Sequence, residues 1–250
     1  MSLSLSVTGT RALVLDIEGT TTPIAFVYEV LFPFARAHAR EYLEREWTSE
    51  PCRNAVAVLR DEHAADVSRN QAPPAWVDDS LILEIASAAA YVGWLMDRDR
   101  KSPGLKALQG EIWRSGYRSG ELRGQVFPDV PPALERWRAR QFVVCIYSSG
   151  SVLAQQLLFQ TTDAGDLTRF LSGYFDTGIG PKVSSDSYRH IAEALAAPAE
   201  RLLFISDVTG ELDAARAAGL QTLLCVRPSN PTPACEHSHP VIRSFDEIVE

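Results

Sequence analysis

Two acidic residues stand two positions apart at the end of an apolar segment, in the stretch RALVLDIEGTTTPIAF (residues 11–26). Side chains at positions i and i+2 of a strand point the same way, so Asp16 and Glu18 should face one site. Neighbouring carboxylates repel unless a cation, a shared proton or a split in pKa relieves them, which suits nucleophilic and acid–base chemistry or a metal site. The alternative is a solvated turn at the strand end, and this pair alone favours that alternative.

Two later segments carry groups that could bind an anion. In YSSGS, Ser148 and Ser149 follow a strand-like run and precede a helix, where hydroxyl and backbone N–H groups can receive a phosphate. The alternative is an ordinary helix N-cap serine. In DTGIGPKVSS, Lys182 lies in a Gly/Pro loop just before a helix and can reach a phosphate as a point charge, although most loop lysines are simply solvated.

A third segment, FISDVTGELD, places Asp207 at the end of an apolar run and Glu211 four positions later. Short acidic side chains provide the oxygen ligands that Mg²⁺ takes in small number while it keeps water ligands. The alternative for Asp207 is a helix N-cap. No single motif decides the chemistry, but an acidic pair, serines, a lysine and an aspartate would converge if their strands were parallel neighbours.

The elements that would position these residues alternate between strands and helices. Strand-like runs cover residues 11–16, 142–150, 201–207 and 220–227. Helical patterns cover residues 131–140, 151–160, 184–196 and 210–219. Such alternation predicts an α/β fold with a doubly wound, mainly parallel sheet, in which ligands bind beyond the carboxyl ends of the strands.

One long segment interrupts this alternation. Residues 24–122 read as helical almost throughout, which predicts an inserted all-helical domain, with residues 1–23 and 123–250 forming the α/β core. One helical pattern in the insert carries an apolar stripe at spacings of three and four. The stripe consists of Leu81, Ile85, Ala88, Val92 and Leu95.

Composition excludes some classes of function. The formal net charge of −8 argues against a nucleic-acid or anionic-membrane surface, which needs a basic face. No signal-peptide core and no run of about 20 apolar residues is present, so we expect neither secretion nor a membrane span. The four cysteines have no CxxC or zinc-ligand spacing and are expected to be reduced thiols in a cytoplasmic protein. His237 and His239, in a polar loop, are expected at the surface.

The ordered motifs resemble those of the haloacid dehalogenase-like superfamily of aspartyl-phosphate phosphatases, and within it the enolase-phosphatase family of methionine salvage. The resemblance rests on LDIEGTTTPIAFVYEVLFPF, DRKSPGLKALQGEIWRSGY, YSSGSVLAQQLLF, GYFDTGIGPKVSSDSY and LFISDVTGELDAARAAG, which span residues 15–219. It implies a Rossmann-like core, and it implies that the helical insert is a cap that closes over the substrate.

The resemblance also implies a role for each candidate residue. Asp16 is similar to the nucleophile and Glu18 to the acid–base residue, where most of the superfamily carries Asp and this family carries Glu. Ser148 and Ser149 match the substrate-binding position, and Lys182 matches the phosphate-binding lysine. One Mg²⁺ per chain is implied, with Asp16, Glu18 and Asp207 as its ligands, and Glu211 as a partner of that site.

The implied reaction is the Mg²⁺-dependent conversion of 2,3-diketo-5-methylthiopentyl 1-phosphate to 1,2-dihydroxy-3-keto-5-methylthiopentene and phosphate. The expected partner is therefore a small phosphorylated diketo metabolite, and the family implies a monomer. Other functions stay open from the sequence: a general small-metabolite phosphatase of the same superfamily, a dehalogenase, or a catalytically silent sensor of phosphorylated metabolites. Two features disfavour the dehalogenase: the residue two positions after Asp16 is an acid, Glu18, and displacement of chloride needs no Mg²⁺ site.

Overall fold

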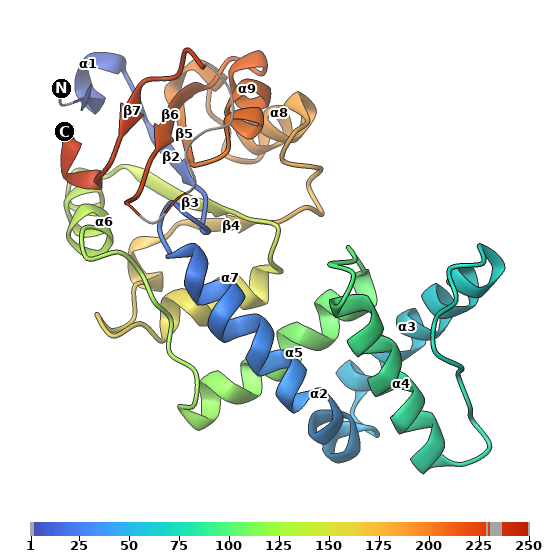
Figure 1. Cartoon of the computed structure of the whole chain (residues 1–250). Coiled ribbons are helices and arrows are strands. Elements are labelled where there is room, and N and C mark those ends of the chain that lie inside the picture. Colours follow the sequence, from blue (N-terminus) through green and yellow to red (C-terminus); the bar gives the residue numbers. More distant parts are fainter. Residues whose placement is uncertain (1–2, 229, 231–236, 250) are drawn as a thin grey trace. The chain divides into compact units, whose positions relative to one another are not determined.

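The chain folds into two compact units, and the computed structural model describes residues 3–228, 230 and 237–249 of it (Figure 1). One unit comprises the residues up to Val27 together with those from Arg123 onward, and it contains a parallel sheet. We call it the sheet unit. The other comprises Tyr28–Leu122 and is built from helices. We call it the helical unit.

The sheet unit confirms the prediction of a mainly parallel α/β fold. Six strands lie in the order β4-β3-β2-β5-β6-β7, and every neighbouring pair is parallel. They are β2 (Ala12–Leu15), β3 (Val143–Tyr147), β4 (Gly173–Phe175), β5 (Leu202–Ser206), β6 (Gln221–Cys225) and β7 (Val241–Ile242). The chain builds β3 and β4 on one side of β2 and then crosses to build β5, β6 and β7 on the other. The carboxyl end of β2 is therefore the topological switch point, where such sheets bind ligands.

The helices between these strands match the predicted pattern. They are α6 (Val130–Ala139), α7 (Val152–Gln160), α8 (Ser185–Ala194) and α9 (Thr209–Ala217). Alternate strand residues such as Val14 and Phe204 pack in one core with Tyr188 of α8 and Leu212 of α9. Because successive strand side chains point to opposite faces, Leu13 and Leu15, which are also fully buried, face the other side. Burial on both faces explains why these strands read as unbroken apolar runs.

Strand register brings the polar strand ends level with one another. Leu15 of β2 pairs with Ile146 of β3 and with Ile205 of β5. The next residue on each strand is therefore Asp16, Tyr147 or Ser206, and Ser148 and Asp207 follow one position later. This alignment is the physical basis for the convergence that the sequence predicted.

The helical unit consists of four longer helices preceded by a π-helical turn, Phe26–Leu31, which spans the boundary between the units. The helices are α2 (Phe32–Glu46), α3 (Glu50–Ser68), α4 (Leu81–Met96) and α5 (Pro103–Ser119). Helix α5 packs against α2 and α3, and α4 packs against α2 and α3. The predicted apolar stripe of α4 is buried except for Leu81, which is 53% exposed because it begins the helix.

A buried charged group lies inside the helical unit, and we call it the Asp66 cluster: Asp66, Tyr91 and Arg100. Asp66 is 1% exposed, and its carboxylate accepts hydrogen bonds from the Tyr91 hydroxyl at 2.8 Å and from Arg100 Nη2 at 2.9 Å. Burial opposes the charge of Asp66, but these two bonds and the charge of Arg100 outweigh it and lower the pKa of the carboxyl. The cluster is thus a balanced ion pair that links α3 to α4 and to the chain that follows it.

Three features of the sheet unit differ from or go beyond the sequence prediction. The edge strands β4 and β7 were not predicted, because they have only three and two residues, which is too short for a recognisable hydrophobic pattern. His239 was expected at the surface but is 4% exposed, since it contacts Thr222 Oγ1 at 2.8 Å and Asp213 Oδ1 at 3.0 Å. A two-stranded parallel pair, β1 (Leu3–Ser4) with β8 (Ile248–Val249), and the short α1 (Leu5–Thr8) complete the termini.

Two further expectations concern cysteines and membranes. Three of the four cysteines are free and buried, namely Cys52, Cys145 and Cys225, whereas Cys235 lies outside the described residues. Burial raises the pKa of the Cys145 thiol to about 12, so this thiol is unreactive at neutral pH. Across the described part of the chain, no helix has both the length and the apolar character that a membrane span requires.

Candidate active site

Asp16 lies at the switch point, directly after β2, and its carboxylate is held by several donors. Its side chain is 5% exposed, and its backbone N–H donates to the Ile205 carbonyl at 2.9 Å. Oδ1 accepts the Ile17 N–H at 2.7 Å, and Oδ2 accepts the Ser206 hydroxyl at 3.0 Å. These bonds fix the orientation of a carboxylate that the packing otherwise isolates from water.

Lys182 meets Asp16 from the loop before α8. Its Nζ lies 2.6 Å from Asp16 Oδ1 and 2.7 Å from Glu211 Oε2, and its side chain is 10% exposed. Burial disfavours the ammonium charge, but the charges of Asp16 and Glu211 outweigh burial and raise the pKa of Lys182. The structure therefore brings together the predicted acidic residue and the predicted lysine as a desolvated ion pair.

Glu211 belongs to the same network, although the sequence suggested it only as a partner of a metal site. It lies in the first turn of α9, and its Oε2 is 2.7 Å from Lys182 Nζ and 3.0 Å from Ser206 Oγ. Burial, together with the charge of Asp16, raises the pKa of Glu211 to about 7. A helix N-terminus favours a negative side chain, which partly offsets the cost of burying this one.

Asp207 follows β5 and is the second acidic group beside Asp16. Asn230 Nδ2 donates to Asp207 Oδ2 at 3.3 Å and to the Gly19 carbonyl at 2.8 Å. Gly19 has a φ of 66°, and a Cβ at that position would collide with the Asp207 carboxylate. Burial, followed by the charge of Asp16, raises the pKa of Asp207 to about 7. Only glycine therefore permits this close approach of the turn to the carboxylate.

Glu18 faces the same region from the turn after β2. It is half-buried, its backbone bridges to Thr22, and its charge adds to the upward shift of the Asp207 pKa. We call the group of five charged side chains the acidic cluster: Asp16, Glu18, Lys182, Asp207 and Glu211. It contains four carboxylates for one ammonium, so it carries excess negative charge when its carboxylates are ionised.

The donor set of the acidic cluster fits a magnesium ion. Within the described residues, no three His, Cys, Asp or Glu side chains are grouped closely enough to hold a metal by themselves, so the predicted ligands do not form a cage of three carboxylates. Mg²⁺ does not require one, because it is usually bound by one or two carboxylates and keeps several waters. The neighbouring carboxylates of Asp16 and Asp207, whose mutual repulsion a divalent cation would relieve, meet that requirement.

Ser148 and Ser149 lie at the same sheet edge but are less closely engaged. Ser148 is 4% exposed, its N–H donates to the Phe175 carbonyl at 3.2 Å, and its Oγ accepts the Gly150 N–H at 3.2 Å. Ser149 is exposed, and the described contacts join neither serine to Asp16 or Lys182. The N-cap of α7 is Ser151, which leaves both predicted serines clear of that role.

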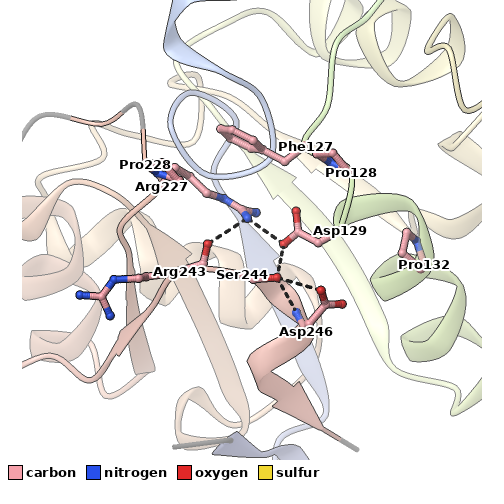
Figure 2. Close-up of a pocket in the computed structure, with 9 residues that line it drawn as sticks. All are labelled: Phe127, Pro128, Asp129, Pro132, Arg227, Pro228, Arg243, Ser244 and Asp246. Carbon is pink, nitrogen blue, oxygen red and sulfur yellow. Dashed lines mark hydrogen bonds and ion pairs between the residues drawn. The ribbon is translucent and has the colours of Figure 1, made fainter.

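Arg227 is a supporting residue that the sequence analysis missed. Its Nε and Nη2 donate to the Thr20 carbonyl at 3.0 and 2.8 Å. Its Nη1 donates to Asp129 Oδ2 at 2.7 Å, as Figure 2 shows. The guanidinium lies 4.3 Å from the Phe127 ring and 4.9 Å from the Phe245 ring. Arg227 is 3% exposed and thus ties the turn after Asp16 to the rest of the unit. A basic residue at the end of the apolar run that contains β6, two positions after the strand, was the available signal.

A cavity of about 410 Å³ lies beside Arg227 (Figure 2). Its lining consists of Phe127, Pro128, Asp129, Pro132, Arg227, Pro228, Arg243, Ser244 and Asp246. None of these residues belongs to the acidic cluster. The polar groups drawn in Figure 2 largely bond one another, with Ser244 Oγ donating to Asp129 Oδ2 at 3.0 Å. The lining residues therefore support the turn after Asp16, and the cavity is separate from the acidic cluster.

Comparisons with known proteins agree with this architecture. A family model described as haloacid dehalogenase-like hydrolase matches residues 10–219. The chain is 46% identical over 248 residues to the enolase-phosphatase E1 of Synechococcus elongatus, which covers 99% of this chain and 100% of that protein. It is 40% identical over 246 residues to the enolase-phosphatase E1 of Danio rerio, covering 96% of this chain and 94% of that protein.

Solved structures give the same picture. The crystal structure of the UTR4 protein of Saccharomyces cerevisiae is similar with a TM-score of 0.76 and 32% identity, and the match covers 95% of this chain and 99% of that one. A solved dehalogenase matches with a TM-score of 0.52 at 18% identity over 95% of each chain, which is a likeness of fold alone.

Proposed function

The chain belongs to the enolase-phosphatase family of haloacid dehalogenase-like hydrolases, and we propose that it converts 2,3-diketo-5-methylthiopentyl 1-phosphate to 1,2-dihydroxy-3-keto-5-methylthiopentene and phosphate in methionine salvage. One observation carries the phosphatase part of this proposal. Lys182 Nζ lies 2.6 Å from Asp16 Oδ1 at the topological switch point, so a phosphate-binding cation stands beside a fixed carboxylate nucleophile.

In this proposal the substrate is first enolised: a proton leaves carbon 1, and the carbonyl oxygen on carbon 2 gains a proton. Asp16 then attacks the phosphorus of the enol phosphate. A new bond forms between a carboxylate oxygen and phosphorus, the bond from phosphorus to the substrate oxygen breaks, and an aspartyl phosphate remains on Asp16. The donors from Ile17 and Ser206 hold the carboxylate in place, which reduces the entropy lost at the transition state. Water then attacks the aspartyl phosphate and releases phosphate.

Lys182 and the serines bind the phosphoryl oxygens, and Glu18 moves the proton. An ammonium group has three donors, and Lys182 directs two of them at Asp16 and Glu211, so the third can serve a phosphoryl oxygen. Ser148 and Ser149 supply hydroxyl and backbone donors from the neighbouring strand end. Glu18 protonates the leaving oxygen and then accepts a proton from the attacking water.

A magnesium ion would be held by the carboxylates of Asp16 and Asp207, with Glu18 as a third ligand through its side chain or its backbone oxygen. When bound, Mg²⁺ offsets the negative charge of the acidic cluster and of the incoming phosphate. Asn230 and Gly19 keep the Asp207 carboxylate in position for this role.

The remaining parts of the proposal concern the role of the helical unit, the oligomeric state and the cellular compartment. The helical unit acts as a cap over the substrate, as its position in the chain between the first strand and the rest of the sheet supports. The protein acts as a monomer in the cytoplasm on a small phosphorylated metabolite. Its buried, unreactive Cys52 and Cys225 thiols are compatible with a reducing compartment.

The test is to incubate the protein with the diketo phosphate and Mg²⁺ and to follow phosphate release and enediol absorbance together. The proposal expects both products in equal amounts, with far slower release from an unrelated phosphomonoester. Phosphate release from many phosphoesters, without an enediol from the diketo phosphate, would identify a general small-metabolite phosphatase instead.

A further inference from the structure

Three buried hydroxyl groups hold three successive backbone carbonyls in the loop that carries Lys182. The Tyr147 hydroxyl donates to the Gly180 carbonyl at 2.8 Å. The Ser187 hydroxyl donates to the Pro181 carbonyl at 2.7 Å. The Tyr188 hydroxyl donates to the carbonyl of Lys182 itself at 2.7 Å. We refer to these donors, Tyr147, Ser187 and Tyr188, as the hydroxyl clamp.

The clamp residues are anchored in regular elements on either side of the loop. Tyr147 is the last residue of β3, Ser187 and Tyr188 lie in α8, and all three are at most 1% exposed. The Tyr147 and Tyr188 rings pack edge to face with centroids 5.6 Å apart, and Tyr188 lies 5.0 Å from Phe204 of β5. The hydroxyls therefore project from a rigid core toward a loop that has little regular structure of its own.

The clamp donors add to the loop's own backbone bonds, in which the Ser184 N–H donates to the Pro181 carbonyl at 3.0 Å. Pro181 has no N–H, and Gly180 adopts a φ of 139°, where a Cβ would collide with the Ser187 side chain. The clamp hydroxyls belong to buried residues, and a buried hydroxyl left without a partner is costly, so each one favours the loop position that presents its carbonyl. Burial raises the pKa of Tyr147 and of Tyr188, which keeps both hydroxyls protonated as donors.

We propose that the hydroxyl clamp positions Lys182, so that Tyr147, Ser187 and Tyr188 determine where its ammonium meets Asp16 and the phosphoryl group. The inference rests on the proposed function for its effect on catalysis but not for its effect on Lys182. The Tyr188 hydroxyl holds the backbone carbonyl of Lys182 itself. A shift of the loop would therefore move the Lys182 ammonium, which lies 2.6 Å from Asp16 Oδ1 and 2.7 Å from Glu211 Oε2. Such geometry is sensitive to displacements of about 1 Å.

The clamp is tested by removing one hydroxyl at a time in the full chain, with the variants Tyr188→Phe, Ser187→Ala and Tyr147→Phe. The matched control is Tyr174→Phe, since the described structure gives the buried Tyr174 hydroxyl no hydrogen-bond partner. The first measurement is amine acetylation followed by peptide mass spectrometry. The chain has three lysines, so exposed Lys101 and half-buried Lys106 serve as internal references for Lys182.

In the wild type, Lys182 should acetylate at least about tenfold more slowly than Lys101, because its ammonium is buried and paired. Tyr188→Phe should accelerate acetylation of Lys182 several-fold while Lys101, Lys106 and the Tyr174→Phe variant stay unchanged. Equal acetylation of Lys182 in the clamp variants and the wild type, with melting temperatures lowered, would mean that the hydroxyls merely stabilise the fold and would overturn the proposal.

The second measurement is phosphate release from the diketo phosphate. Tyr188→Phe is expected to lower kcat by about tenfold and to raise the inhibition constant of inorganic phosphate by a similar factor, whereas Tyr174→Phe changes neither. A kcat unchanged in all three clamp variants would contradict the proposal. A wild type that releases no phosphate would instead remove the proposed function, and the acetylation result would still decide whether the clamp holds Lys182.

Discussion

Each compact unit buries a cluster of charges, and the two clusters have opposite balances. The Asp66 cluster in the helical unit pairs one carboxylate with one guanidinium and one hydroxyl, and the pKa of Asp66 is lowered. The acidic cluster in the sheet unit surrounds one ammonium with several carboxylates, and the pKa values of Asp207 and Glu211 are raised to about 7. Folding therefore favours the charged form of Asp66, whereas it disfavours the charged forms of Asp207 and Glu211.

The difference separates a cluster that stabilises a fold from one whose charges are suited to chemistry. A balanced, hydrogen-bonded pair needs nothing further and would gain nothing from a ligand. An unbalanced cluster stores electrostatic repulsion, and a cation or a reacting group relieves it. Arg227 and Asp129 form a second balanced pair, and its position under the turn after Asp16 shows that such pairs also support the unbalanced one.

The largest expected effect comes from the acid that would bind the metal. Asp207→Ala should lower kcat/KM by about 10³-fold, because it removes a ligand of the cation that screens the phosphate charge. Glu211→Ala should cost far less, roughly tenfold, because Glu211 acts through Lys182. EDTA should abolish phosphate release and excess Mg²⁺ should restore it. Comparable losses in the two variants would make Glu211 a metal ligand as well.

The next effect is the dependence of Mg²⁺ stabilisation on pH. Because the folded-state pKa values of Asp207 and Glu211 exceed the ordinary values of 3.8 and 4.5, the metal-free folded protein binds extra protons and loses stability as pH rises through about 4 to 7. Mg²⁺ at 100 times its dissociation constant should therefore raise the melting temperature by about 5–10 °C at pH 8. At the same Mg²⁺ concentration, the rise in melting temperature should be at most half as large at pH 5.5, because protons then compete with the cation for the carboxylates. A rise independent of pH would contradict the unbalanced cluster.

The same substitution in the two clusters should have opposite consequences. Asp66→Asn should lower the free energy of unfolding by about 2 kcal/mol, because it breaks a balanced pair whose arginine is partly hydrated. This loss should fade as pH falls below 4, since the lowered pKa of Asp66 contributes stability only above the unfolded-state value. Activity well below the melting temperature should stay within about twofold of the wild type.

In contrast, Asp16→Asn should leave the stability of the metal-free protein unchanged or raise it by up to about 1 kcal/mol, because it removes the charge that repels Asp207 and Glu211. Denaturant unfolding of both variants, followed beside the wild type at pH 7.5, makes the comparison. Equal destabilisation by the two substitutions would show that the clusters do not differ in balance.

The smallest effect concerns the support of the turn. Arg227→Lys keeps the charge beside Asp129 but cannot donate two bonds to the Thr20 carbonyl, so kcat should fall by about tenfold with KM little changed. Exposed Arg243, which lines the same cavity, gives the control variant Arg243→Lys, for which no change is expected. A loss confined to thermal stability would mean that Arg227 supports the unit and not the site.

Much of this architecture was predictable because buried parallel strands have a strong pattern. The central strands β2, β3, β5 and β6 are buried on both faces, and their apolar runs end in the polar residues that mark the site. The edge strands β4 and β7 were missed, because strands this short are defined by the neighbour they pair with rather than by their own residues.

Several residues of the candidate site were predictable from the sequence, but their contacts were not. Asp16 and Lys182, 166 positions apart in the chain, were predicted to meet because parallel topology brings strand ends together. The serine at position 206 escaped notice because it sits inside an apolar run, and Asn230 lies in a loop without a pattern. Contacts such as these depend on side-chain packing across the fold, which periodicity does not encode.

The central claim is that Asp16 carries the phosphoryl group, and trapping that group tests it most directly. The wild type is mixed with Mg²⁺ and the diketo phosphate, quenched in acid during turnover, digested and analysed by mass spectrometry. The account predicts one phosphoryl group on the peptide that contains Asp16, and none in Asp16→Asn, which releases phosphate at least about 10³-fold more slowly. Unchanged phosphate release by Asp16→Asn, or turnover with the phosphoryl group on another residue, would contradict it.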